Sequence, residues 1–210
     1  YSRLLDWGLR VTLLLALPAA AALAVLAMPL IATLFHYGRF SAEDAWMTRE
    51  ALVAYSLGLV GMILVKILAP GFYAMQNVVT PVKIGLLTLA ATQAMNLAFI
   101  GPFKHAGLAL AIGLGACLNA WLLYLMLRKQ SIYAPQPGWL VFALKIGGSV
   151  LAMAAALWFA MGPAAAWLQA GWQWKAGMLA ALVALGIAVY GACLFVLGFR
   201  PRDFSIRGAN

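Results

Sequence analysis

The chain has 210 residues, of which 66% are hydrophobic and 9% are charged, and its 14 lysines and arginines outnumber its 5 acidic residues. A soluble domain carries roughly 25% charged residues, so this chain has too little polar surface to cover a globule in water. The basic residues lie singly or in pairs between apolar runs, as topology signals of membrane proteins do. The composition predicts an integral membrane protein and no nucleic-acid partner.

Six apolar runs follow one another, and each is long enough to cross about 30 Å of hydrocarbon at about 1.5 Å per residue. None alternates with a period of two, which excludes a membrane β-barrel. The sequence therefore predicts an all-α integral membrane fold with six transmembrane helices. The runs cover 9–35 (with Pro18 and Pro29 inside it), 51–75, 84–103, 107–127, 139–161 and 174–199.

Polar residues mark where some of these helices begin. Ser41 and Asp44 have the spacing of a capping box, which predicts that the second helix starts in water. Thr80 is expected to cap the third helix, with Pro81 at its first position. Between the fifth and sixth runs, we interpret 164–174 (AAAWLQAGWQW) as a connecting loop, with a short amphipathic turn along the outer surface as the alternative.

The basic residues also predict the orientation. An even number of spans puts both termini on one side, and ten of the fourteen basic residues fall on that side. Because cytoplasmic loops are enriched in lysine and arginine, both termini of the chain are expected in the cytoplasm. The ten are Arg3, Arg10, Lys66, Lys83, Arg128, Lys129, Lys145, Arg200, Arg202 and Arg207, against Arg39, Arg49, Lys104 and Lys175.

The stretch 65–77 (VKILAPGFYAMQN) places a lysine and a proline–glycine pair within an apolar run. If the helix ended before Pro70, Lys66 would extend to the headgroups. We favour a helix that kinks at Pro70 and Gly71 and continues to Gln76, because 70–79 would be an unusually apolar loop. Lys66 then lies about 15 Å from the inner end, where it must face a wet cavity or an anion.

The third and fourth runs each carry one stripe of polar or small residues at a spacing of four. We interpret the stripes as helix–helix contacts, with the wall of a wet cavity or part of a cation site as the alternative. The fifth and sixth runs are rich in glycine and alanine, which predicts either close packing or an apolar groove. The stripe of the third run is Thr88, Thr92 and Asn96 (beside Gln93), and that of the fourth is Ala111, Gly115 and Asn119. The small residues are Gly147, Gly148 and Ala152 in the fifth run and Ala184 and Ala188 in the sixth.

The sequence contains no recognisable catalytic motif. No acidic pair is spaced to hold Mg²⁺, no phosphate-binding loop precedes a helix, and no Ser–His–Asp or Cys–His arrangement is recognisable. His36 and His105 have no second ligand at metal spacing. We expect no enzyme, no cofactor and no metal site.

Five stretches are the most distinctive of the chain: KILAPGFYAMQN (66–77), TPVKI (80–84), MNLAFIGPFKHAGLALAIG (95–113), LNAWLLYLMLRK (118–129) and PQPGW (135–139). In them the chain resembles the MurJ (MviN) lipid II flippases, members of the multidrug, oligosaccharidyl-lipid and polysaccharide exporter superfamily. Members of this family have fourteen membrane helices, arranged as two six-helix lobes and an extra pair. The resemblance implies that this chain contains helices nine to fourteen. Residues 1–130 would be the second part of the C-terminal lobe, and 131–210 the extra pair with a cytoplasmic tail.

The resemblance also implies a function. Lipid II, the undecaprenyl-pyrophosphate-linked peptidoglycan precursor, would be moved from the inner to the outer leaflet of the bacterial inner membrane by alternating access. The partners would be lipid II, membrane lipids and the missing N-terminal half, which holds most headgroup-binding arginines. The cavity candidates in this chain are Lys66, Tyr73, Gln93, Asn96 and Asn119. The lipid-tail groove would lie on Gly147, Gly148, Ala152, Ala184 and Ala188.

Some members of the family have been assigned a sodium site on the helices that match the third and fourth runs. This chain offers Thr92 and Asn96 there, but no acid, and it has Ile112 where a hydroxyl would be needed. The start at Tyr1 is typical of the interior of a longer chain. The alternatives to a lipid II flippase are an exporter of another lipid-linked oligosaccharide or a drug, a membrane subunit that transports nothing, and a polyprenyl-processing enzyme.

Overall fold

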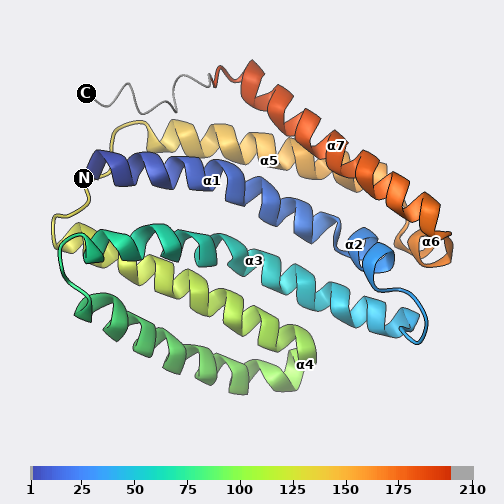
Figure 1. Cartoon of the computed structure of the whole chain (residues 1–210), viewed down its shortest axis with the longest axis horizontal. Coiled ribbons are helices and arrows are strands. Elements are labelled where there is room, and N and C mark those ends of the chain that lie inside the picture. Colours follow the sequence, from blue (N-terminus) through green and yellow to red (C-terminus); the bar gives the residue numbers. More distant parts are fainter. Residues whose placement is uncertain (1, 200–210) are drawn as a thin grey trace.

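The computed structural model describes residues 2–199, apart from the side chains of 102–104. Figure 1 shows long helices that run back and forth along one axis. In order they are α1 (Ser2–Val25), α2 (Ala27–Leu34), α3 (Ala42–Tyr73), α4 (Val79–Lys129), α5 (Trp139–Met161), α6 (Ala164–Gln169) and α7 (Trp172–Val196). Six helical segments of the described residues are long and apolar enough to cross a membrane, which confirms the predicted six-span all-α fold.

The first apolar run forms two helices instead of one. α1 ends at Val25, four residues before Pro29, because a proline cannot donate to that carbonyl and its ring clashes with it. Pro18 lies within α1 and frees the carbonyl of Leu14 in the same way. The Tyr190 hydroxyl of α7 donates to that oxygen over 2.7 Å, so a neighbouring helix satisfies the group that the proline leaves unpaired.

α3 begins as the sequence predicts. The Asp44 backbone N–H donates to Ser41 Oγ over 3.1 Å, and the Ser41 backbone N–H donates to Asp44 Oδ2 over 2.9 Å, which confirms the capping box. The helix continues through Pro70, also as predicted, but ends at Tyr73 and not at Gln76. Gln76 has a positive φ of 55° and turns the chain toward α4.

The third and fourth runs are joined without a break into α4, which folds back on itself as a hairpin (Figure 1). Its two spans are Val79–Gly101 and His105–Lys129. The predicted cap at Thr80 is wrong, because Thr80 lies inside the helix. Instead, its backbone N–H donates to the side-chain oxygen of Asn77 over 3.1 Å.

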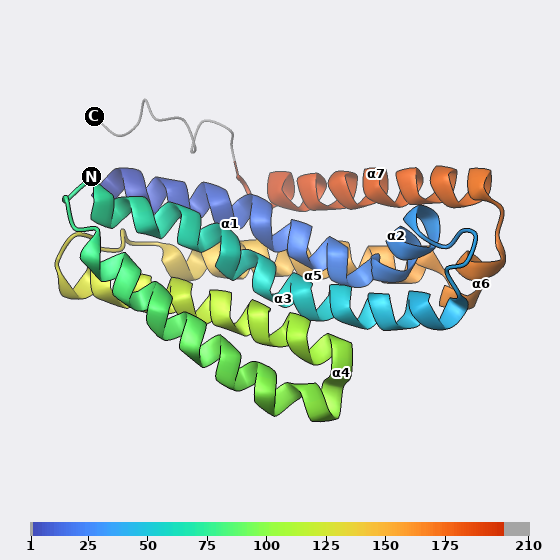
Figure 2. The ribbon, with the colours of Figure 1, turned by 60° about the horizontal axis from the view of Figure 1, so that its bottom comes forward.

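In Figure 1 the C-terminal pair, α5 and α7, lies on the opposite side of α1 and α3 from the α4 hairpin, and Figure 2 again shows α7 and the hairpin on opposite sides. The two helices pack together where Gly186 meets Leu157. Between them, the predicted loop at 164–174 is wrong. Most of this segment is helical, as α6 and the start of α7. Trp167 of α6 is fully buried, and its ring N–H donates to the Met161 carbonyl over 2.8 Å.

α3 and the second span of α4 are in backbone contact. A Cβ added at Gly58 would lie 2.1 Å from Gly113 Cα, and one added at Gly61 would lie 2.6 Å from the Cys117 nitrogen. Only glycine allows these helices to approach so closely. The contact fixes α3 against α4 and so determines which face of α3 remains uncovered.

Candidate functional site

Lys66 and Tyr73 lie on one uncovered face of α3. Lys66, Pro70 and Tyr73 are all exposed, at spacings of four and three residues that place them on the same side of the helix. Lys66 is seven residues from the end of α3, or about 10 Å along the axis. The structure therefore brings these two predicted cavity residues together.

Pro70 and Gly71 lie in different surroundings. Pro70 is exposed, whereas Gly71 is buried, and a Cβ added there would lie 3.1 Å from Leu127 Cδ2. Gly71 thus lets α3 pack against the end of α4. The predicted kink at this pair stays a prediction.

The polar stripe and the small stripe of α4 face each other across the hairpin. A Cβ added at Gly115 would lie 2.0 Å from Thr92 Oγ1, so the two spans are in contact at this level. The Thr92 hydroxyl donates to the Thr88 carbonyl of its own helix over 2.7 Å. This contact agrees with the packing interpretation of the two stripes.

The three amides predicted for the cavity occupy different surroundings. Gln93 is exposed, and its Oε1 accepts from the Asn96 side-chain nitrogen over 3.4 Å. The side-chain oxygens of Asn96 and Asn119 are buried and have no hydrogen-bond partner. No described hydrogen bond joins these amides to Lys66 or Tyr73. Within the described residues, no group of three histidine, cysteine or acidic side chains is arranged to hold a metal ion.

The five groove candidates lie away from the contact between α5 and α7. Gly148, Ala152, Ala184 and Ala188 are exposed, and Gly147 is half-buried. A Cβ added at Gly147 or Gly148 would meet no atom within 4 Å. These positions are therefore not used for packing among the described helices, and they lie uncovered beside larger exposed apolar side chains such as Leu151 and Ile187.

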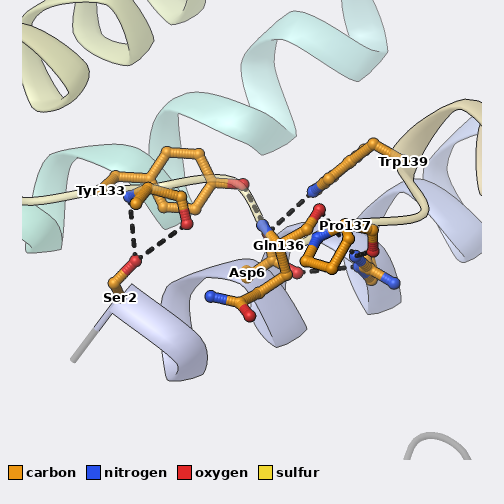
Figure 3. Close-up of polar contacts among 8 residues, drawn as sticks. Ser2, Asp6, Tyr133, Gln136, Pro137 and Trp139 are labelled. Carbon is orange, nitrogen blue, oxygen red and sulfur yellow. Dashed lines mark hydrogen bonds and ion pairs between the residues drawn. The ribbon is translucent and has the colours of Figure 1, made fainter.

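A polar cluster that the sequence analysis missed joins the start of α1 to residues 133–139 (Figure 3). Its centre is the carboxylate of Asp6, a residue that is 3% exposed. Asp6 Oδ1 accepts from the Tyr133 hydroxyl over 2.7 Å, the Trp139 ring nitrogen over 2.8 Å and the Gln136 backbone nitrogen over 3.2 Å. Asp6 Oδ2 lies 2.8 Å from Arg10 Nε. We call Asp6, Arg10, Tyr133, Gln136 and Trp139 the Asp6 cluster.

Tyr133 lies in the connection between α4 and α5 and is itself buried. Burial and the hydrogen bond to the Asp6 carboxylate raise the pKa of its hydroxyl above the ordinary value. The hydroxyl therefore remains protonated and donates throughout the physiological range. One signal in the sequence pointed to the cluster, namely the spacing of four between Asp6 and Arg10, which favours an ion pair on a helix.

An apolar cavity of about 360 Å³ lies beside this cluster, between α1, α3, α4 and the start of α5. The rings of Trp121, Tyr124, Tyr133 and Trp139 line it. Tyr133 and Trp139 direct their polar groups to Asp6, and the lining residues include no lysine, arginine or histidine that could bind a phosphate.

Comparison with known proteins places this arrangement in a family. The family model of the lipid II flippase MurJ matches residues 1–184. The chain belongs to the MurJ lipid II flippase family. Among curated members, it is 50% identical over 208 residues to the lipid II flippase MurJ of Burkholderia cenocepacia, covering 99% of this chain. It is 40% identical over 196 residues to the probable lipid II flippase MurJ of Haemophilus influenzae, covering 93% of this chain.

The chain spans 40% and 38% of the lengths of these two members. A solved structure of lipid II flippase MurJ in an inward closed conformation superimposes with a TM-score of 0.77, over 96% of this chain and 39% of that one. The sequence identity is 21%, so this likeness shows a shared fold. The membrane fold and the family predicted from the sequence are thus confirmed.

Proposed function

We propose that the protein containing this chain is a lipid II flippase that moves the peptidoglycan precursor from the inner to the outer leaflet by alternating access. The family membership supports the substrate, since the curated relatives are named lipid II flippases. The observation in the structure that carries the proposal is Lys66. It is a lysine inside a membrane span, exposed on the surface of these helices.

A lysine at this depth is costly in contact with lipid and is tolerated where it faces water or an anion. In a two-lobed transporter, the uncovered face of α3 would form one wall of the central cavity, with Lys66 directed at the pyrophosphate. Tyr73 would extend this wall by its position on the same face. Gln93, Asn96 and Asn119 are further candidates for the wall, supported by the exposed amide of Gln93 and the unpaired oxygens of the other two.

The C-terminal pair would receive the lipid tail. This part of the proposal is supported by the uncovered surface at Gly147, Gly148, Ala152, Ala184 and Ala188, where no described side chain packs against the two glycines. A long polyprenyl chain needs an uncovered apolar surface. In this proposal, residues 1–130 belong to the C-terminal lobe and 131–210 to the extra pair.

Both termini of the chain are proposed to be cytoplasmic. The connections after α3 and after α4 lie at the same end of the bundle as the start of α1 (Figure 1). Most of the basic side chains that the structure describes gather toward this end, among them Arg3, Lys83, Arg128 and Lys129. The excess of positive charge supports a cytoplasmic position for it.

A complementation experiment tests the function. Cells depleted of their own lipid II flippase would receive the full-length gene that encodes this chain. We expect growth and cell shape to be restored. A well-expressed, membrane-inserted protein that fails to restore growth would contradict the proposal, and restored export of a different lipid-linked sugar would replace it.

A further inference from the structure

The C-terminal pair meets the rest of the molecule mainly through α1 and α2. α5 packs against α1, α7 packs against α2, and residues 130–138 connect α4 to α5. We call helices α1 to α4 the four-span unit. The position of the pair relative to this unit therefore depends on the contacts that α1 and α2 make.

The Asp6 cluster lies at this joint. The Asp6 carboxylate is nearly fully buried, and burial of a charge is unfavourable unless donors surround it. Three of its donors come from residues 133–139, outside α1. Asp6 Oδ1 is thus satisfied only when this connection lies against the start of α1.

Arg10 extends the contact from Asp6 to α5. Its Nη2 donates to the Pro137 carbonyl over 3.1 Å, and its guanidinium lies 5.3 Å from the Trp139 ring centre and 5.6 Å from that of Phe142. Guanidinium groups bind both carboxylates and aromatic faces. One side chain of α1 therefore contacts the connection and the first turn of α5 together.

α7 has its own polar bond to α1. The Tyr190 hydroxyl donates to the Leu14 carbonyl, which Pro18 leaves free. This bond lies about two turns of α1 away from the Asp6 cluster. Each helix of the C-terminal pair is thus attached to α1 by directional bonds as well as by apolar packing.

We propose that Asp6 and Arg10 are positioning residues that fix the C-terminal pair to the four-span unit, so that both move as one rigid body during transport. The functional meaning rests on the proposed flippase activity. The lipid tail on α5 and α7 would then keep a constant distance from the cavity wall on α3 while the other lobe moves.

Distances between spin labels in the full-length protein test the rigid attachment. One label pair joins Leu86 on α4 to Leu144 on α5, and a control pair joins Leu151 on α5 to Ile187 on α7, all of which are exposed side chains. In the wild type we expect one narrow distribution for each pair. In Asp6→Ala, the first distribution should become at least twofold broader, while the control distribution stays unchanged.

Two further variants keep the test decisive if Asp6→Ala does not fold. Tyr133→Phe removes one donor and keeps the ring, and should broaden the first distribution by a smaller factor. The double variant Asp6→Asn with Arg10→Gln should be at least as broad as Asp6→Asn alone, because it also loses the Arg10 contacts to Pro137 and Trp139. Unchanged distributions in all folded variants would overturn the inference.

Transport in the same proteins separates this inference from the proposed function. At equal amounts of folded protein in the membrane, we expect Asp6→Ala to move lipid II at least fivefold more slowly than the wild type. If the wild-type protein itself moves no lipid II, the proposed function fails, whereas the label distances still report the attachment. If Asp6→Ala has a broad distribution and transports at the wild-type rate, the positioning role is wrong.

Discussion

At the scale of single residues, the chemistry of the chain is concentrated in a few charged and hydroxyl groups placed in apolar surroundings. Lys66 is uncovered, Asp6 is enclosed by donors, and Tyr190 donates to a carbonyl that a proline leaves free. An unpaired polar group is expensive in hydrocarbon. Each of these groups therefore has either a partner in the chain or a proposed partner outside it.

Replacement of Lys66 tests whether this lysine contacts lipid II from the proposed cavity wall on α3. A charge-assisted contact contributes about 1.5–3 kcal/mol, so Lys66→Ala should lower transport at limiting lipid II by about tenfold or more. Lys66→Arg keeps the charge and should retain part of the activity. Transport measured at equal expression is the readout, and Lys83→Ala, an exposed lysine at the start of α4, is the control. Equal transport by wild type and Lys66→Ala would mean that the lysine reaches the headgroups instead.

Replacement of Tyr190 tests whether its hydrogen bond to the Leu14 carbonyl, which Pro18 leaves free, stabilises the protein. Tyr190→Phe removes the hydroxyl and leaves the Leu14 oxygen without its donor, which should lower the free energy of unfolding by about 1–3 kcal/mol. Thermal or denaturant unfolding in detergent measures this change. Tyr55→Phe, at an exposed tyrosine, should alter the free energy by less than about 0.5 kcal/mol. Equal effects of the two changes would show that the bond contributes nothing.

At the scale of helices, glycines serve two opposite purposes. Gly58 and Gly61 let α3 touch α4 backbone to backbone, whereas Gly147 and Gly148 meet no neighbour. The sequence alone does not separate these roles, because both pairs lie in similar apolar helices. The structure separates them by the space around each Cα.

A matched pair of substitutions uses this difference. Gly58→Leu forces α3 away from α4 and should destabilise the protein by at least about 1–3 kcal/mol. Gly148→Leu meets open space and should leave stability unchanged, yet it should slow transport if the lipid tail lies there. Melting temperature and transport are measured for both. Normal transport by a stable Gly148→Leu protein would argue against the groove.

Local signals made much of the helical architecture predictable. The lengths of the apolar runs predict six spans, and the spacing of Ser41 and Asp44 predicts where α3 starts. The end of α3, the cap of α4 and the helix α6 were missed, because Gln76, Asn77 and Trp167 act through turns and buried contacts that no periodicity records. The Asp6 cluster was missed because Tyr133 and Trp139 are 127 and 133 residues away from Asp6 along the chain.

At the scale of the whole molecule, α1 holds the central position. It lies between α3 and α5 (Figure 1), packs against both, and contacts residues 133–139 through its first turns. The four-span unit presents Lys66, and the C-terminal pair presents the uncovered glycines and alanines. A precursor with a charged headgroup and a long apolar tail would need both surfaces at a fixed separation.

The most direct test of this account is the transbilayer movement of lipid II in vesicles that contain the purified full-length protein. Labelled lipid II would be placed in one leaflet, and its appearance in the other would be followed with a membrane-impermeant probe. We predict that lipid II moves faster than in protein-free vesicles and that the rate falls in Lys66→Ala. A folded wild-type protein that moves lipid II no faster than protein-free vesicles, under any membrane potential or ion gradient applied, would contradict it.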